Sequence, residues 1–133
     1  MSDVTYHFPD YNTILLLHNN ARTEFNSGLC KISYDDKLID YALSWAEHMS
    51  NENKLSHSNI SNIMKLGFSR VGENIAYGQK NEKDVMNSWL KSYGHKKNIM
   101  NKHYTHMGFG YSYSEKNILY WCVCFGKRTI DKT

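Results

Sequence analysis

Histidines and a carboxylate with the spacing of a shared site stand out first in this sequence. Residues 89–109 hold a tryptophan, three histidines and a glycine expected to end a helix. Residues 71–77 carry Glu73 inside an otherwise apolar run, and His57 lies upstream between two serines. Because an unpaired buried charge is costly, Glu73 needs a histidine, an arginine or a metal ion beside it. We therefore expect His57, Glu73 and His95 to converge in one cleft.

Three interpretations of His57, Glu73 and His95 remain open. Two imidazoles and a carboxylate could hold Zn²⁺ with one position open, which lowers the pKa of a bound water. Without a metal, Glu73 could hydrogen-bond to a histidine and hold one of its tautomers. The third alternative is that Glu73 lies on the solvent-facing side of an edge strand.

The elements expected to position these residues follow from apolar periodicity and capping residues. They are a helix from Asp10 or Asn12 to about Phe25, a short extended piece over 30–34, a helix from Asp35 or Asp36 to about Met49, a short helix capped by Ser61 and closed by Gly67, a strand over 71–77, a helix capped by Asn81 and stopped by Gly94, a further turn or two over 95–100, and a hairpin of strands over 108–113 and 118–125. Helices come first and the hairpin last, which predicts an α+β fold in which helices flank a small, mostly antiparallel sheet.

Length and composition limit the function classes. The 133 residues predict a single domain, and 41% hydrophobic residues are enough for one core. The net charge of +3 comes with lysines spread along the chain, which favours a solvated surface over a nucleic-acid interface. The longest apolar run, residues 14–17, is far too short for a transmembrane segment. Residues 1–13 lack the pattern of a signal peptide, so either the protein is cytosolic or an export signal has been removed.

The three cysteines are expected to be free. Cys122 and Cys124 are two apart in a predicted strand, where a direct disulfide has poor geometry. Cys30 could pair with one of them, but three buried free thiols is the favoured interpretation.

His18 and Arg22 are four apart on the first predicted helix and therefore neighbours on its surface. Two interpretations are equally open. They are the polar edge of a packed helix, or they form a hydrogen-bond network that ties this helix to the loop of the site.

Several motifs recur in an order and spacing that resemble a known family. They are HNNAR at 18–22, HS at 57–58, GENIA at 72–76, the segment from Trp89 through SYGHKKNIM at 92–100, GFG at 108–110, and YW with FG between 120 and 126. Together they resemble the CAP superfamily (SCP/TAPS: cysteine-rich secretory proteins, antigen 5, pathogenesis-related 1) over about residues 11–126. The Gly-His-x-x-Asn-Ile-Met form is similar to its compact bacterial branch.

The resemblance implies a three-layer α-β-α sandwich with a cavity that holds two histidines and two acidic residues. His57 and Glu73 match the first histidine and the first glutamate, and His95 matches the second histidine. Ser92 stands at the second acidic position. His57 and His95 are then the candidate ligands of Zn²⁺, although no cofactor is required.

His103 is a rival for the second histidine, because it precedes an aromatic-Thr pair. The distance from His95 to the following Gly-Phe-Gly, residues 108–110, equals the family's distance from its histidine to that strand. The resemblance therefore favours His95.

The functional expectation is a single CAP/SCP domain over residues 1–133 that binds and does not catalyse. The resemblance implies a monomer exported as a secreted, periplasmic or membrane-anchored lipoprotein whose signal segment is absent from this chain. Its expected partners are a lipid or sterol, or a host or partner protein surface, and not nucleic acid. The alternative is a metal-dependent hydrolase or protease that uses His57, Glu73 and His95.

Overall fold

The protein's structure, a computed structural model, describes residues 6–25 and 28–129. In chain order its elements are α1 (Tyr11–Phe25), β1 (Ser33–Tyr34), α2 (Asp36–Glu52), α3 (Ser61–Met64), β2 (Phe68–Tyr77), α4 (Glu82–Lys91), α5 (Tyr93–Ile99), β3 (His106–Tyr113) and β4 (Leu119–Arg128). No helix in the described part of the chain combines the length and apolarity needed to cross a membrane.

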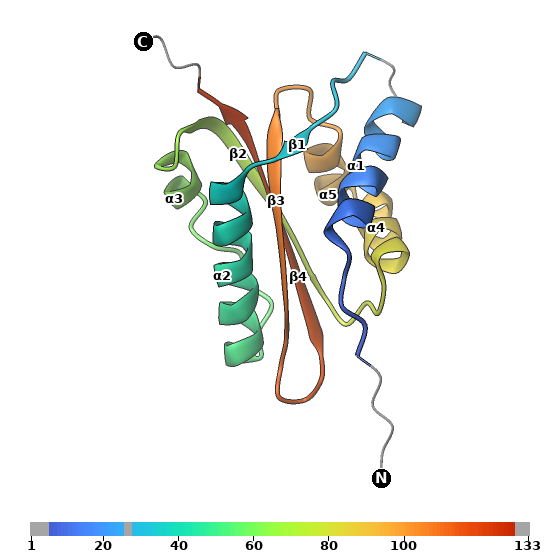
Figure 1. The fold of residues 1–133 in the computed structure, drawn as a ribbon, viewed down its shortest axis with the longest axis vertical. Coiled ribbons are helices and arrows are strands. Elements are labelled where there is room, and N and C mark those ends of the chain that lie inside the picture. Colours follow the sequence, from blue (N-terminus) through green and yellow to red (C-terminus); the bar gives the residue numbers. More distant parts are fainter. Residues whose placement is uncertain (1–5, 26–27, 130–133) are drawn as a thin grey trace.

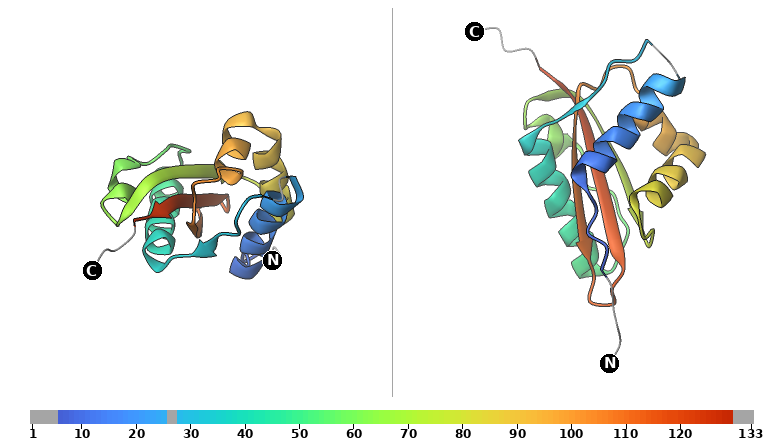
Figure 2. Two further views of the ribbon diagram at one scale, coloured as in Figure 1. Left: turned by 90° about the horizontal axis from the view of Figure 1, so that it is seen from above. Right: turned by 45° about the vertical axis from the view of Figure 1, so that its right-hand side comes forward.

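The four strands form one sheet in the order β1-β3-β4-β2. β4 pairs antiparallel with both β2 and β3, whereas the two-residue β1 runs parallel to β3. Helices α2 and α3 lie on one side of the sheet, and α1, α4 and α5 lie on the other (Figures 1 and 2). The predicted three-layer α-β-α sandwich with a mostly antiparallel sheet is confirmed.

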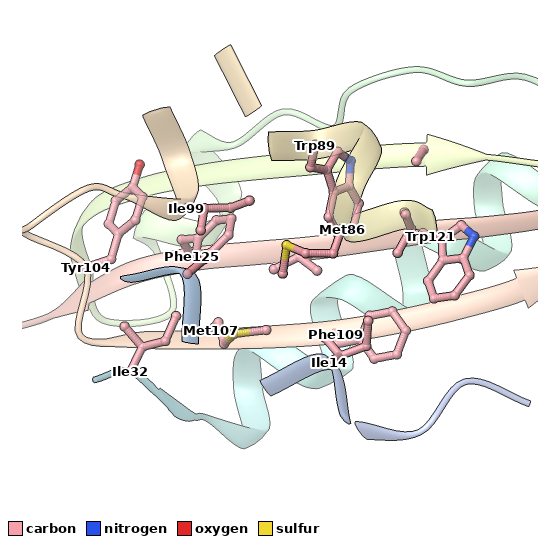
Figure 3. Close-up of a cluster of buried hydrophobic side chains, with 14 of the residues drawn as sticks. Ile14, Ile32, Met86, Trp89, Ile99, Tyr104, Met107, Phe109, Trp121 and Phe125 are labelled. Atoms are coloured by element: carbon pink, nitrogen blue, oxygen red, sulfur yellow. The ribbon is translucent and has the colours of Figure 1, made fainter. Parts of the chain in front are cut away.

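Two apolar clusters fill the spaces between the layers. Between the sheet and helices α1, α4 and α5, side chains such as Trp89, Phe109 and Trp121 form the larger cluster, shown in Figure 3. Between the sheet and α2, the smaller cluster includes Cys122 and Cys124. Alternate residues of β4 therefore enter opposite clusters, which explains why this strand is apolar on both faces.

Glycines allow α2 to pack directly on β3. A Cβ atom at Gly108 would lie 2.0 Å from the carbonyl carbon of Leu38, and one at Gly110 would lie 2.3 Å from the Cα of Leu43. Phe109, between them, points to the opposite cluster. The Gly-Phe-Gly motif thus supplies close contact on one face of the sheet and apolar volume on the other.

Three predicted helix boundaries are wrong. Gly67 does not close α3, because this helix ends at Met64 and Lys65 is its C-terminal cap. Gly94 does not stop α4, because the break comes earlier at Ser92, which is extended (φ −103°, ψ 125°), and Gly94 lies inside α5. Ser61 does not cap α3. It is the first helical residue, and the side chain of Asn59 accepts from its backbone N–H instead.

The remaining elements agree closely with the prediction. Asp35 caps α2 by accepting from two backbone N–H groups, and Asn81 caps α4 in the same way. Strand β2 starts three residues earlier than expected, at Phe68, and only two residues of the expected extended piece form β1.

All three cysteines are free, as predicted. Cys122 and Cys124 are buried, but Cys30 is exposed, so its predicted burial is wrong. Cys30 precedes β1 in a connecting segment, and there its carbonyl oxygen, rather than its thiol, is used: it accepts from Arg22 Nε at 2.9 Å.

Arg22 forms a buried hydrogen-bond network that reaches beyond α1, as the second interpretation of this helix face expects, whereas the hydrogen bond of His18 is to its own helix. Its Nη1 donates to the carbonyl oxygens of Ile99 and Asn101, both at 2.9 Å. One turn away, buried His18 donates from Nδ1 to the carbonyl of Ile14 at 2.7 Å, and burial lowers the pKa of His18 to about 4. Helix α1 is thereby attached to the end of α5, the helix that carries His95.

The glycine contacts predict opposite effects of two Gly→Ala changes. Gly108→Ala should destabilise the fold by about 3 kcal/mol, because the new Cβ overlaps the backbone of α2. Gly94→Ala is the matched control: apart from its own helix backbone and chain neighbours, no atom of the described residues lies within 4 Å of its Cβ position, and alanine is the better helix residue, so stability should rise by up to about 1 kcal/mol. Urea denaturation of both variants measures the difference, and equal stabilities would contradict this packing.

Candidate functional site

Glu73 is a buried carboxylate whose two oxygens both accept hydrogen bonds. Only 4% of the residue is exposed, so the solvent-facing alternative is wrong. Oε1 accepts from the backbone N–H of Ser58 at 2.9 Å and from His57 Nδ1 at 3.0 Å, and Oε2 accepts from the hydroxyl of Ser58 at 2.5 Å. Because a carboxylate only accepts, Nδ1 of His57 carries the proton.

The loop that carries these donors is held from α2 as well. Asn53 ends α2 in the left-handed conformation (φ 53°) and turns the chain back along the helix. Trp45 Nε1 donates to the carbonyl of Ser56 at 2.7 Å, and the Tyr41 hydroxyl donates to Ser58 Oγ at 2.8 Å. The loop is thus fixed between α2 and β2, with the hydroxyl of Ser58 between Tyr41 and the Glu73 carboxylate.

Glu73 and Asn74 are consecutive residues of β2 whose side chains form hydrogen bonds on opposite faces of the sheet. Glu73 lies opposite Cys124 in the sheet register and faces α2, whereas Asn74 faces α5. Asn74 Nδ2 donates to the carbonyl of His95 at 3.0 Å, and its Oδ1 accepts from Asn98 Nδ2 at 2.8 Å. The contribution of Asn74 and Asn98 was missed by the sequence analysis, although both lie inside the motifs that carry the resemblance.

His95 lies on the α5 side of β2, whereas Glu73 faces α2 on the other side of this edge strand. It is half-buried on α5, and its Nδ1 is buried with no hydrogen-bond partner among the residues that the structure describes. Burial lowers the pKa of His95, and the nearby His57 lowers it further. His57 and His95 are close enough to interact electrostatically, but of the two only His57 bonds to Glu73, and the pocket that His95 lines includes neither His57 nor Glu73, so convergence of all three in one cleft stays a prediction.

Ser92 and His95 line a common pocket of about 230 Å³. Its other walls come from α4, the end of β2 and the loop after α2, including Trp89, Ser88 and Leu55. Ser92 thus lies beside His95, where the resemblance places the second acidic residue, but it brings a hydroxyl instead of a carboxylate.

The predicted zinc ligands do not form a compact three-ligand group in this structure. Across residues 6–25 and 28–129, the one group of three candidate ligand atoms within 4.8 Å of one another is Glu73, Cys122 and Cys124. A zinc ion held by His57 and His95 would need water to complete its coordination. Metal binding by the two histidines stays a prediction.

A larger hollow lies between α2 and α3 and was not expected from the sequence. Its volume is about 720 Å³, and its wall is formed by Lys37, Asp40, Tyr41, Ser44, Trp45, His48, Ser58, Asn59, Asn62 and Leu66. The rings of Trp45 and His48 are stacked with centroids 4.6 Å apart. The helix residues recur at three and four along α2, which is the one sequence signal that could have revealed this face.

Known proteins of one family resemble this chain in sequence and in fold. The profile of the cysteine-rich secretory protein family (CAP) matches residues 15–125. The Bacillus subtilis protein YkwD is 35% identical over 92 residues, which are 63% of this chain and 36% of that protein. This chain therefore spans about a third of the length of that relative.

Solved structures share the fold. An outer surface protein from Borrelia burgdorferi has a TM-score of 0.77 and 25% identity, over 94% of this chain and all of that chain. An extracellular SCP-domain protein from Bacillus anthracis has a TM-score of 0.74 and 26% identity, over 88% of this chain and 40% of that chain.

The hydrogen bonds predict that Glu73 and His57 contribute unequally to stability. Glu73→Gln should cost about 2–4 kcal/mol, because buried donors lose a charged acceptor. His57→Ala should cost about 1 kcal/mol or less, because 62% of the His57 side chain is exposed and water replaces the lost contact. Chemical denaturation at neutral pH gives both values, and a larger loss for His57→Ala would contradict the assigned role of Glu73.

Proposed function

The chain belongs to the cysteine-rich secretory protein (CAP) family, and on that basis we propose that it is an extracytoplasmic binding domain that takes up a lipid-like molecule without altering it chemically. An extracytoplasmic location is supported by the relatives described as outer surface and extracellular proteins. The ligand would occupy the hollow between α2 and α3, with the sterol or acyl part against the aromatic side chains and the polar head at the rim.

The observation that carries the binding role is the hollow itself. Its volume of about 720 Å³ falls in the range of small-molecule sites, and it combines aromatic and polar groups as such sites do. Tyr41, Trp45 and Leu66 offer apolar surface, while Lys37 and Asn62 offer donors for a carboxylate or hydroxyl head group.

The state of Glu73 supports a binding role over a catalytic one. A general base must reach the proton that it removes. Both Glu73 oxygens are instead occupied by the loop that carries His57, and the second acidic position holds Ser92.

A host or partner protein surface is the other class of ligand that the family resemblance implies.

The alternative of a metal-dependent hydrolase rests on His95. Its buried Nδ1 lacks a partner among the described residues and lies beside the pocket that Ser92 also lines. Ester or peptide turnover that follows zinc occupancy and disappears in a His57→Ala, His95→Ala double variant would favour this alternative.

A matched pair of substitutions tests the binding site. Ser44 and Ser88 are both exposed helix residues, but Ser44 lines the hollow between α2 and α3, whereas Ser88 lines the pocket of His95. The probes are the fluorescent fatty acid cis-parinaric acid and the fluorescent sterol dehydroergosterol. Ser44→Trp should weaken binding of the recognised probe at least about tenfold, by more than 1.4 kcal/mol, because the indole fills the hollow. Ser88→Trp should leave it unchanged.

The outcomes separate the competing sites and ligands. A preference for one probe identifies the fatty-acid or the sterol class. Loss of binding in Ser88→Trp alone would move the ligand to the pocket of His95. If the unmodified protein binds neither probe, the lipid-binding proposal is wrong.

A further inference from the structure

A second group of chemically reactive side chains lies on the inner side of Glu73. Cys122 and Cys124 are alternate residues of β4, and Glu73 lies opposite Cys124 on β2, so all three face α2. The two sulfur atoms are 3.8 Å apart, and Cys124 Sγ lies 4.0 Å from Glu73 Oε2. All three side chains are buried.

These separations match those of ligands around a tetrahedral zinc ion. With Zn–S bonds of about 2.3 Å, two thiolates at the tetrahedral angle are roughly 3.8 Å apart. A thiolate and a carboxylate oxygen at about 2.0 Å from the ion are roughly 3.5 Å apart. The sulfur pair already has the required spacing, and the separation of Cys124 Sγ from the carboxylate oxygen is about half an ångström longer than required.

We propose that Cys122, Cys124 and Glu73 bind one thiophilic divalent cation of the zinc type. The histidines predicted as zinc ligands, His57 and His95, are not part of this group. Three protein ligands leave one coordination position for a hydroxyl or a water.

Binding of a divalent cation leaves the net charge of this buried cluster unchanged. A divalent cation enters and two thiol protons leave, so the net charge of the cluster stays at −1. The thiolate, not the thiol, is the form of cysteine that binds a metal ion, so each cysteine gives up its proton when the ion binds. Binding should therefore release two protons for each ion.

The surroundings of Glu73 prepare one oxygen for the ion. His57 and the backbone of Ser58 bond to Oε1, while Oε2 accepts from the Ser58 hydroxyl at 2.5 Å and lies 4.0 Å from Cys124 Sγ, with a second lone pair available for an ion. Such contacts orient a ligand and tune its basicity. Tyr41 and Ser58, which line the large hollow, are hydrogen-bonded to each other, and Ser58 also bonds to Oε2, so the cluster lies directly behind the wall of the hollow.

Titration with CoCl₂ tests the site, because thiolate–cobalt bonds produce charge-transfer absorption in the near ultraviolet. The reduced protein should bind one equivalent of Co²⁺ with this absorption and release two protons in unbuffered solution. The apparent affinity should therefore rise about 100-fold per pH unit while the thiols are protonated. Zn²⁺ should displace the cobalt and abolish the absorption.

Matched cysteine variants locate the ligands. Cys124→Ser should abolish the charge-transfer absorption, whereas Cys30→Ser, which changes the exposed cysteine, should retain it. His95→Ala should also retain it. Absorption that disappears in Cys30→Ser and persists in Cys124→Ser would overturn the proposal.

The unmodified protein gives a decisive result on its own if Cys124→Ser does not fold. Weak cobalt absorption without thiolate charge transfer, or release of no protons on binding, would overturn the proposal regardless of the variants.

Discussion

Glu73 lies on the edge strand β2, and its buried carboxylate requires donors that only a neighbouring segment can supply. Ser58 and His57 supply them, and in doing so they fix the loop after α2 against the sheet. The position of that loop in turn determines one wall of each hollow, because Ser58 lines the larger and Leu55 the smaller. Both candidate binding places therefore depend on one buried acceptor.

Through the Gly-Glu-Asn segment at 72–74, the edge strand β2 contacts elements of both helical layers. Gly72 leaves space for Tyr104 and Asn98, since an added Cβ would lie 2.4 Å from the Tyr104 hydroxyl oxygen. Glu73 and Asn74 then point to opposite faces and engage the loop after α2 and helix α5. The alternation of a single strand thus joins both helical layers, and the two histidines approach each other around its free edge.

The family resemblance places His57, Glu73 and His95 in one cavity, but their contacts in this structure differ. His57 is tied to Glu73, while His95 faces a different pocket with Ser92. The inner side of Glu73 meets two thiols, which is a softer ligand environment than imidazole. The two sites proposed above, one for an organic ligand and one for a metal ion, are adjacent, and neither requires a site formed by the two histidines together.

Much of the fold could be predicted because its local signals agree with its packing. Asp35 and Asn81 cap their helices as expected, and the hairpin of β3 and β4 follows from apolar runs separated by a turn. The break at Ser92 was missed, since a serine has no strong breaking tendency and the glycine two residues later is the stronger signal. A glycine can still lie inside a helix when packing of the neighbouring turns decides.

The candidate site was only partly predictable for a related reason. Spacing along the chain identifies His57, Glu73 and His95, but which oxygens and nitrogens meet depends on the path of the loop at 53–60. The cluster of Glu73 with Cys122 and Cys124 depends on the register between β2 and β4, and a shift by one residue would place the carboxylate on the other face. Register of this kind is set by tertiary packing and cannot be read from the motifs.

The most direct test of the central claim is hydrogen exchange at the backbone amide of Ser58. This amide lies outside every helix and strand, so its protection depends on its bond to Glu73 Oε1. We expect exchange at least about 100-fold slower than in an unstructured peptide. We also expect Glu73→Gln to remove this protection while the amides of β3 and β4 remain protected. Exchange of the Ser58 amide at the unprotected rate in the unmodified protein would contradict the claim that Glu73 anchors the loop.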